Sequence, residues 1–285
     1  MVGMSETDTP ARPAYDEPRA RFRDLLAAEW LRFRSLRSTR WGVLLSAVVV
    51  IGMNVNAAFA DYRNWPHYDA NLRHQFVPGW AMNDAFSNGA AFVLVLTVGT
   101  LGALTIVSDY ASGLARTTFA AVPARRSVVA AKAAVLTAIM TTYGAVVSVV
   151  SFLATQAILA GRGAGLTLAY PEAGRAVVAS ALLAPVCALV GLGLGAVVRH
   201  TAGSVVAAVA VLLLLPNLID QKHRVTAAVV HALPLSAWQR LSEPGVVPFP
   251  GNPYPATVPA SWLVYGAWAL AGVVAAVLVV HRRDL

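Results

Sequence analysis

Six long stretches of this 285-residue chain contain no Asp, Glu, Lys, Arg or His. They are residues 41–60, 88–107, 133–160, 176–198, 204–219 and 260–280. Most approach or exceed the roughly 20 apolar residues that cross a hydrocarbon core about 30 Å thick. This pattern predicts an all-α polytopic membrane protein with six transmembrane helices. It argues against a secondary carrier, because ion-coupled carriers usually place carboxylates or histidines inside the bilayer as relays. Work on a cargo would then be powered from outside these helices.

The sequence lacks the residues that several kinds of chemistry require. The only cysteine, Cys187, lies in the fourth stretch, which excludes an intrachain disulfide and gives no hint of a Cys-based metal site. The run Gly-Leu-Gly-Leu-Gly at 191–195 has no strand before it and no Gly-Lys-Ser/Thr after it, so it favours close helix packing over a nucleotide loop. The six histidines are scattered, with no pair at metal-binding spacing. We expect no enzyme activity, no cofactor and no metal in this chain.

The net charge of +8 is explained by residues that flank the spans rather than by nucleic-acid binding. With the N-terminus inside, fifteen of the 22 Lys and Arg residues fall on the cytosolic side and seven on the outer side. Both termini are therefore predicted to be cytosolic, in a multi-pass protein of the plasma membrane. About 40 residues precede the first apolar stretch, so we expect it to be a retained signal anchor rather than a cleaved signal peptide.

The N-terminal region has two parts. Residues 1–18 are polar and proline-containing, which predicts a disordered cytosolic tail. Residues 19–40 predict an amphipathic helix along the cytosolic leaflet, with arginines facing lipid phosphates. Its apolar positions follow helical spacing: Phe22, Leu25, Leu26, Trp30, Phe33 and Leu36. Glu29 lies amid this stripe, where it either pairs with Arg32 on the same helix or forms an ion pair to the segment between the second and third spans.

Two outer segments are expected. Residues 61–87 carry Trp65, Tyr68 and Trp80, which suit an interfacial aromatic belt. In the outer segment 220–259, residues 225–241 are too short and interrupted to span, which predicts a re-entrant or interface-lying helix before the sixth span. Six prolines in residues 243–259 exclude a regular helix there.

The segment after the second span is the most informative polar stretch. Gly113 could end the span, residues 114–122 could form a short surface helix, and Pro123 would stop it. Arg125 and Arg126 would then face lipid phosphates or a partner. Taken alone, this is an ordinary basic cytosolic loop.

This segment resembles the signature region of ATP-binding-cassette exporter permeases of the ABC-two class. In that region an acidic residue and often an aromatic are followed by Ser-Gly, Arg-Thr-Thr and Pro-x-Arg-Arg. The matching positions are Asp109, Tyr110, Ser112, Gly113, Arg116, Thr117, Thr118, Pro123, Arg125 and Arg126. Residues 19–40 with Glu29 resemble the family's elbow helix, 199–203 its fourth-to-fifth turn, and 282–284 its ending. Asp109 occupies a position where Glu is commoner in that family, and Asp keeps the negative charge.

The resemblance implies a six-span permease domain over residues 41–285 that pairs with a second copy or a paralogue. ATP and Mg would bind a separate cytosolic ATPase subunit, and residues 114–122 would be the coupling helix that docks on it. Asp109, Gly113, Arg116, Thr117, Thr118, Pro123, Arg125 and Arg126 would then serve ATPase coupling. The second and fifth spans would line the path, and the apolar fifth span suits a hydrophobic or amphipathic cargo.

Asp109 ends the second span, where a carboxylate is poorly placed against exposed helix carbonyls. We expect compensation from Arg116 or from the arginines of the amphipathic helix, which would tie the coupling segment to that helix. The alternative function is a non-transporting membrane scaffold or immunity protein. The excess of Ala, Val, Arg and Gly over Lys and Ile indicates a GC-rich bacterial genome.

Overall fold

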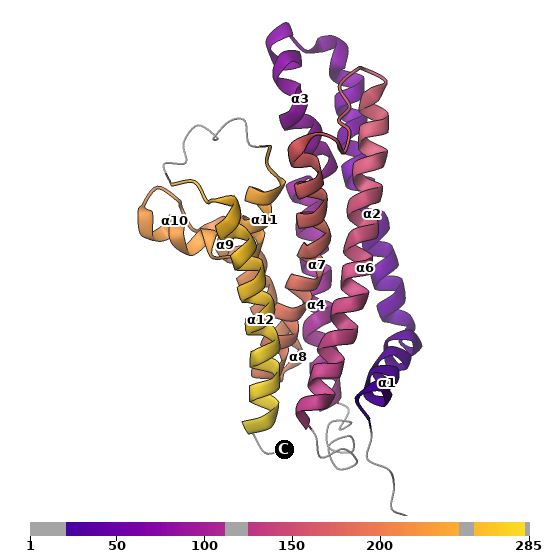
Figure 1. Ribbon diagram of the computed structural model, residues 1–285, viewed down its shortest axis with the longest axis vertical. Helices are drawn as coiled ribbons and strands as arrows, with labels where there is room; N and C mark the ends of the chain where they lie inside the picture. The colour runs from indigo at the N-terminus through magenta and orange to yellow at the C-terminus, as the bar shows by residue number, and fades with distance from the viewer. Residues whose placement is uncertain (1–20, 112–124, 245–253, 283–285) are drawn as a thin grey trace, which may run out of the picture.

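The computed structural model describes residues 21–111, 125–244 and 254–282, and every regular element in these residues is a helix (Figure 1). The elements in order are α1 (Phe22–Ser35), α2 (Arg37–Asn64), the 3-10 turn η1 (Trp65–His67), α3 (Ala70–Ala85), α4 (Asn88–Ala111), α6 (Arg125–Ala160), α7 (Pro171–Val198), α8 (Thr201–Val209), the π-helical turn η2 (Ala210–Leu214), α9 (Leu215–Leu218), α10 (Arg224–His231), α11 (Pro234–Ser242) and α12 (Val258–Arg282).

Six helical segments of the described chain are long and apolar enough to cross a membrane. They are Arg37–His67, Ala70–Ala111, Arg125–Ala160, Pro171–Val198, Thr201–Leu218 and Val258–Val280. The prediction of an all-helical protein with six such helices is confirmed. Helix α1, the end of α4, the start of α6 and the end of α12 lie at one end of the bundle, here the α1 end, whereas α3 lies at the opposite end, here the α3 end (Figure 1).

Helix α7 packs against α4, α6 and α12, and glycines at these crossings bring the helices into backbone contact. A Cβ atom added to Gly102 of α4 would lie 2.0 Å from a carbonyl oxygen of α7, and one added to Gly144 of α6 would lie 2.1 Å from another. A Cβ atom added to Gly272 of α12 would likewise lie 2.3 Å from a carbonyl oxygen of α7. A Cβ atom added to Gly191 of α7 would lie 2.1 Å from a carbonyl oxygen of α4, which agrees with the packing role predicted for the 191–195 run.

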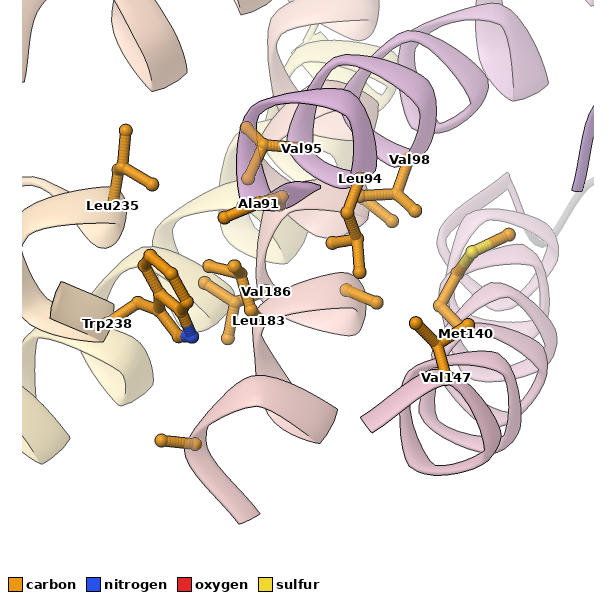
Figure 2. Packing of buried hydrophobic residues seen from close by; sticks show 14 of the residues in the cluster. Ala91, Leu94, Val95, Val98, Met140, Val147, Leu183, Val186, Leu235 and Trp238 are labelled. Carbon is orange, nitrogen blue, oxygen red and sulfur yellow. The ribbon is translucent and has the colours of Figure 1, made fainter. Parts of the chain in front are cut away.

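Around these crossings the core is apolar. Figure 2 shows Leu94 and Val98 of α4 on the side of Met140 and Val147 of α6, and Ala91 and Val95 on the side of Leu235 and Trp238 of α11. The outward faces of the bundle are apolar as well, since Val48 is 69% exposed and Leu263 is 75% exposed. Monomeric soluble proteins rarely expose such surface, so these faces suit lipid or another helical chain.

The segment 61–87 differs from the predicted outer loop because it contains α3. Asp69 caps this helix by accepting from the Leu72 amide at 2.6 Å, and Pro78 interrupts it. The rings of Trp65 and Tyr68 pack on the buried Phe76, with the Trp65 and Phe76 centroids 5.0 Å apart. Two of the three expected belt aromatics therefore help to hold α3 on the bundle.

Three further boundaries differ from expectation. The helix predicted over 19–40 breaks at Leu36, which has extended backbone angles between α1 and α2. The helix predicted over 225–241 is two helices, α10 and α11, with Pro234 in the first turn of the second. Helix α12 begins at Val258 with Pro259 in its first turn, where proline is tolerated, so the proline-rich stretch ends earlier than predicted. The predicted tail 1–18 lies outside the described residues.

Candidate functional site

Helix α1, the end of α4 and the start of α6 meet at the α1 end of the bundle and bring four charged side chains together. Helix α1 supplies Glu29 and Arg32, which are three residues apart and therefore share one face. The last turns of α4 supply Asp109, and the second turn of α6 supplies Lys132. We call these four residues the charge cluster. Phe33 of α1 packs against the apolar core beside it, which fixes that face of α1 toward the bundle.

Within the charge cluster, positive and negative groups alternate. The Lys132 Nζ atom lies 2.7 Å from Oε2 of Glu29 and 3.2 Å from Oδ2 of Asp109. The other oxygen of Asp109 accepts a hydrogen bond from Nη2 of Arg32. The Lys132 side chain is 3% exposed, and the two carboxylates are 14% exposed. An ammonium is thus held between two carboxylates, almost out of contact with solvent.

The formal charges of the cluster cancel, and this neutralisation is what allows charged groups to be so little exposed to solvent. Removing one partner of a buried pair typically costs about 3–5 kcal/mol, because the other charge stays buried without compensation. Asp109 also lies near the carbonyl end of α4, where a carboxylate is unfavourable. Arg32 and Lys132 supply the compensating charge. The cluster therefore fastens α1 to α4 and α6 through interactions that are costly to break singly.

The contacts decide between the alternatives that the sequence left open for Glu29, and for Asp109 they show one of the two kinds of partner expected. Glu29 contacts Lys132 at the beginning of the third span, and it forms no ion pair with Arg32. Asp109 contacts Arg32, an arginine of the amphipathic helix. Arg125 begins α6, and Arg126 next to it is exposed. Five other predicted coupling residues lie outside the described residues, namely Gly113, Arg116, Thr117, Thr118 and Pro123.

Lys132 is the member of the charge cluster that the sequence analysis did not single out. The available signal was its place in the chain, because a lone cation shortly before a charge-free stretch of 28 residues has to find partners at the membrane boundary. What the sequence could not supply was the identity of those partners. Glu29 is 103 positions away along the chain.

A second contact joins α4 to the turn between α7 and α8. Arg199 ends α7 in the left-handed conformation, with φ of 56°, and its guanidinium carbon lies 4.8 Å from the centre of the Tyr110 ring. His200 then caps α8 by accepting from the Gly203 amide at 3.2 Å. Tyr110 follows Asp109 directly, so the end of α4 is linked to α1 and α6 by charge and to α7 by ring stacking.

No protein-family model and no curated protein matches this chain. Function is therefore argued from the fold and from the charge cluster, together with the motifs that surround it. In the described part of the chain, no group of three or more His, Cys, Asp or Glu residues is arranged to hold a metal ion.

A cavity of about 30 Å³ lies between α2, α4, α6, α7 and α11. Its polar lining is internally satisfied, since Asn54 donates to Ser151 at 3.1 Å and Trp238 donates to Ser180 at 2.9 Å. About 10–15 Å³ is needed for each water molecule, so this space holds about two or three waters and is too small for a cargo.

Proposed function

We propose that this chain is the transmembrane permease subunit of an ATP-driven exporter of the ABC-two class. The observation that carries the proposal is the charge cluster. It ties α1 to the two helices that flank residues 112–124, the segment with the signature motif: Asp109 precedes that segment and Lys132 follows it. A force applied to that segment by a partner would reach α4, α6 and α1 together rather than one helix at a time.

The energy would come from a separate ATPase subunit that binds ATP and Mg. A ligand shifts a conformational equilibrium only through different affinities for the two states, and ATP supplies that difference at the partner. The permease needs no proton relay of its own. This agrees with the absence of charged residues and histidine from the six stretches that first indicated the spans.

Two permease chains would enclose the path for cargo. The fifth span exposes Val206 (66%) and Leu218 (76%) on the single bundle, and such surface suits a facing copy or lipid. A path bordered by these residues would accept a hydrophobic or amphipathic cargo. In this arrangement the α1 end faces the cytosol, as the distribution of Lys and Arg predicts.

The test is co-purification followed by a change within the charge cluster. The chain is expressed together with any ATPase that its neighbouring reading frames encode, reconstituted in liposomes, and assayed for cargo-stimulated ATP hydrolysis and export. Asp109→Asn keeps the shape of the side chain and removes one charge. It should insert and bind the ATPase largely as before, because Lys132 keeps Glu29 as its partner and Arg32 is 30% exposed. The coupling free energy between distant sites is typically about 1–3 kcal/mol, so export should fall roughly 5- to 150-fold.

Asp24→Asn is the matched control, because Asp24 is a carboxylate of the same helix that is 56% exposed. It should leave export unchanged. Recovery of the chain without any ATPase would favour the scaffold alternative. Export at the parental rate by Asp109→Asn, with the ATPase bound, would remove the charge cluster from the coupling mechanism.

A further inference from the structure

A second pair of charged residues lies at the opposite, α3 end of the bundle. Asp84 belongs to α3 and is 4% exposed, and Asp61 belongs to the last turn of α2. The Asp84 carboxyl is within hydrogen-bonding reach of the Asp61 carboxyl. Two buried or half-buried acids thus face each other where α3 joins α2.

No cation neutralises this pair within the described residues. Arg162, at the end of α6, donates instead to the Tyr62 carbonyl at 3.1 Å and stacks on the Tyr62 ring. Arg73 of α3 donates to the Pro66 carbonyl at 3.1 Å. From α6, the neutral Gln156 amide bonds the backbone at Ala81 and at Leu166. His67 and His74 are exposed. Neither acid forms an ion pair with any of them.

Tyr68 is the remaining titratable group at the pair, and it distinguishes the two acids. Its hydroxyl donates to Oδ1 of Asp61 at 2.7 Å. Burial, followed by the hydrogen bond to Asp61, raises the pKa of Tyr68 to about 12, so the hydroxyl remains a donor at physiological pH. Asp61 therefore has a donor that favours its ionised form.

Asp84 has no such donor. Its Oδ2 atom is inaccessible and receives no hydrogen bond from the described residues. A buried oxygen left in this state is costly if the group is ionised. Two carboxylates in contact also repel, and in such pairs one group keeps its proton. A proton on Asp84 removes both penalties, because it ends the repulsion and can be donated to Asp61.

We propose that Asp61 and Asp84 share a single proton and form an acid clamp that holds α3 on the end of α2. The clamp is closed while Asp84 carries the proton. Loss of the proton at higher pH leaves two like charges in contact and loosens α3. This device depends on the described contacts alone and does not require the transport function.

The first measurement is infrared spectroscopy of the purified full-length chain in lipid nanodiscs. A protonated carboxylic acid has a C=O stretching band above the carboxylate bands, and the band shifts in deuterated water. We expect such a band at pH 7 in the parent protein, its loss as pH rises, and its absence from Asp84→Asn. This titration of the parent protein needs no variant to fold. Absence of the band from pH 5 to pH 9 would overturn the proposal.

The second measurement is thermal unfolding against pH. The folded pair holds a proton that the unfolded chain has released, so the unfolding equilibrium constant should rise about tenfold per pH unit until the folded pair also loses it. Asp84→Asn can donate to Asp61 at any pH and should lack this component. Asp69→Asn is the control, because Asp69 is an exposed residue of the same region and Asn also caps helices. It should keep the slope of the parent.

Addition of Ca²⁺ or Mg²⁺ distinguishes a pair that shares a proton from a pair that binds a metal ion, because these hard cations prefer oxygen ligands. A clamp that shares a proton should melt at the same temperature with either ion or with a chelator. Stabilisation by the ions in the parent but not in Asp84→Asn would show that the pair binds a metal ion. If the unfolding equilibrium of the two proteins depended equally on pH, the pair would hold no proton. Either result would overturn the clamp.

Discussion

Replacement of Gly272 by alanine should separate α12 from α7. The added Cβ atom would lie 2.3 Å from the Leu189 carbonyl oxygen, 2.6 Å from its carbon and 3.1 Å from the Val190 nitrogen. These are backbone atoms of a packed helix, so rotation of a side chain cannot relieve the contact. On the facing side, a Cβ atom added to Gly193 of α7 would lie 2.8 Å from the backbone of Gly272, so the two helices cross at a pair of glycines.

The expected magnitude is the difference between two effects. Overpacking typically costs about 1–3 kcal/mol, because the elements have to shift to make room. Alanine is favoured over glycine inside a helix by about 1 kcal/mol, which partly offsets that loss. Because only backbone atoms can move apart here, the overpacking cost should lie in the upper part of that range, about 2–3 kcal/mol, and the net destabilisation should be about 1–2 kcal/mol. At roughly 2–4 °C for each kcal/mol, Tm should fall by about 2–8 °C.

The chain carries its own probe for this experiment. Cys187 is the only cysteine, it is fully buried, and it lies on α7 close to the crossing. A thiol-reactive fluorescent dye should therefore react only when α7 is uncovered, and its signal during heating reports that event. Gly266→Ala is the control on the same helix, because a Cβ atom there would meet nothing within 4 Å. Its Tm should be equal to that of the parent or higher. The reasoning fails if Gly272→Ala melts no lower than Gly266→Ala.

Two further predictions concern α11 and the orientation of the bundle. Trp238→Phe removes the indole N–H that donates to Ser180 at 2.9 Å, so it should destabilise the fold by about 1–2 kcal/mol in a denaturant titration, and full stability would show that the hydrogen bond is not needed. In a Cys187→Ala background, cysteine introduced at the exposed His74 should react with an impermeant maleimide on intact cells, whereas cysteine introduced at the exposed Arg126 should react only after permeabilisation. Reversed labelling would contradict the orientation derived from the Lys and Arg distribution.

The spanning helices were predictable because their signal is local. A stretch without charge has one low-energy solution in a bilayer, and each of the six stretches lies within one of the spanning segments, except that the fifth helical segment ends at Leu218. The ends were less accurate. Helix α6 begins at Arg125 and carries Lys132 inside it, whereas absence of charge placed the third span only after Lys132. A charge can lie inside a long helix when tertiary contacts neutralise it.

The partners within the two charge sites were not predictable, because they depend on contacts between distant segments. Nothing local to Glu29 specifies Lys132, and the choice follows from how α1 lies across α6. Helix α3 was missed for a related reason. Its sequence contains Arg73, Pro78 and Asp84, which are typical of a polar loop. Its helical form depends on burial against α2 and α6, where Asp84 meets Asp61.

The unequal lengths of two spans have a consequence for the surrounding lipid. Helix α6 has 36 residues and is roughly 54 Å long at about 1.5 Å per residue, whereas the fifth span has 18 residues and measures roughly 27 Å. The first exceeds a hydrocarbon core of about 30 Å, and the second falls short of it. The charged Asp220 and Lys222 follow directly after the short span. Lipid beside it has to thin, which costs a fraction of a kcal/mol for each ångström of mismatch. Acyl-chain length should therefore act on this protein at its fifth span, where shorter chains match the helix better than longer ones.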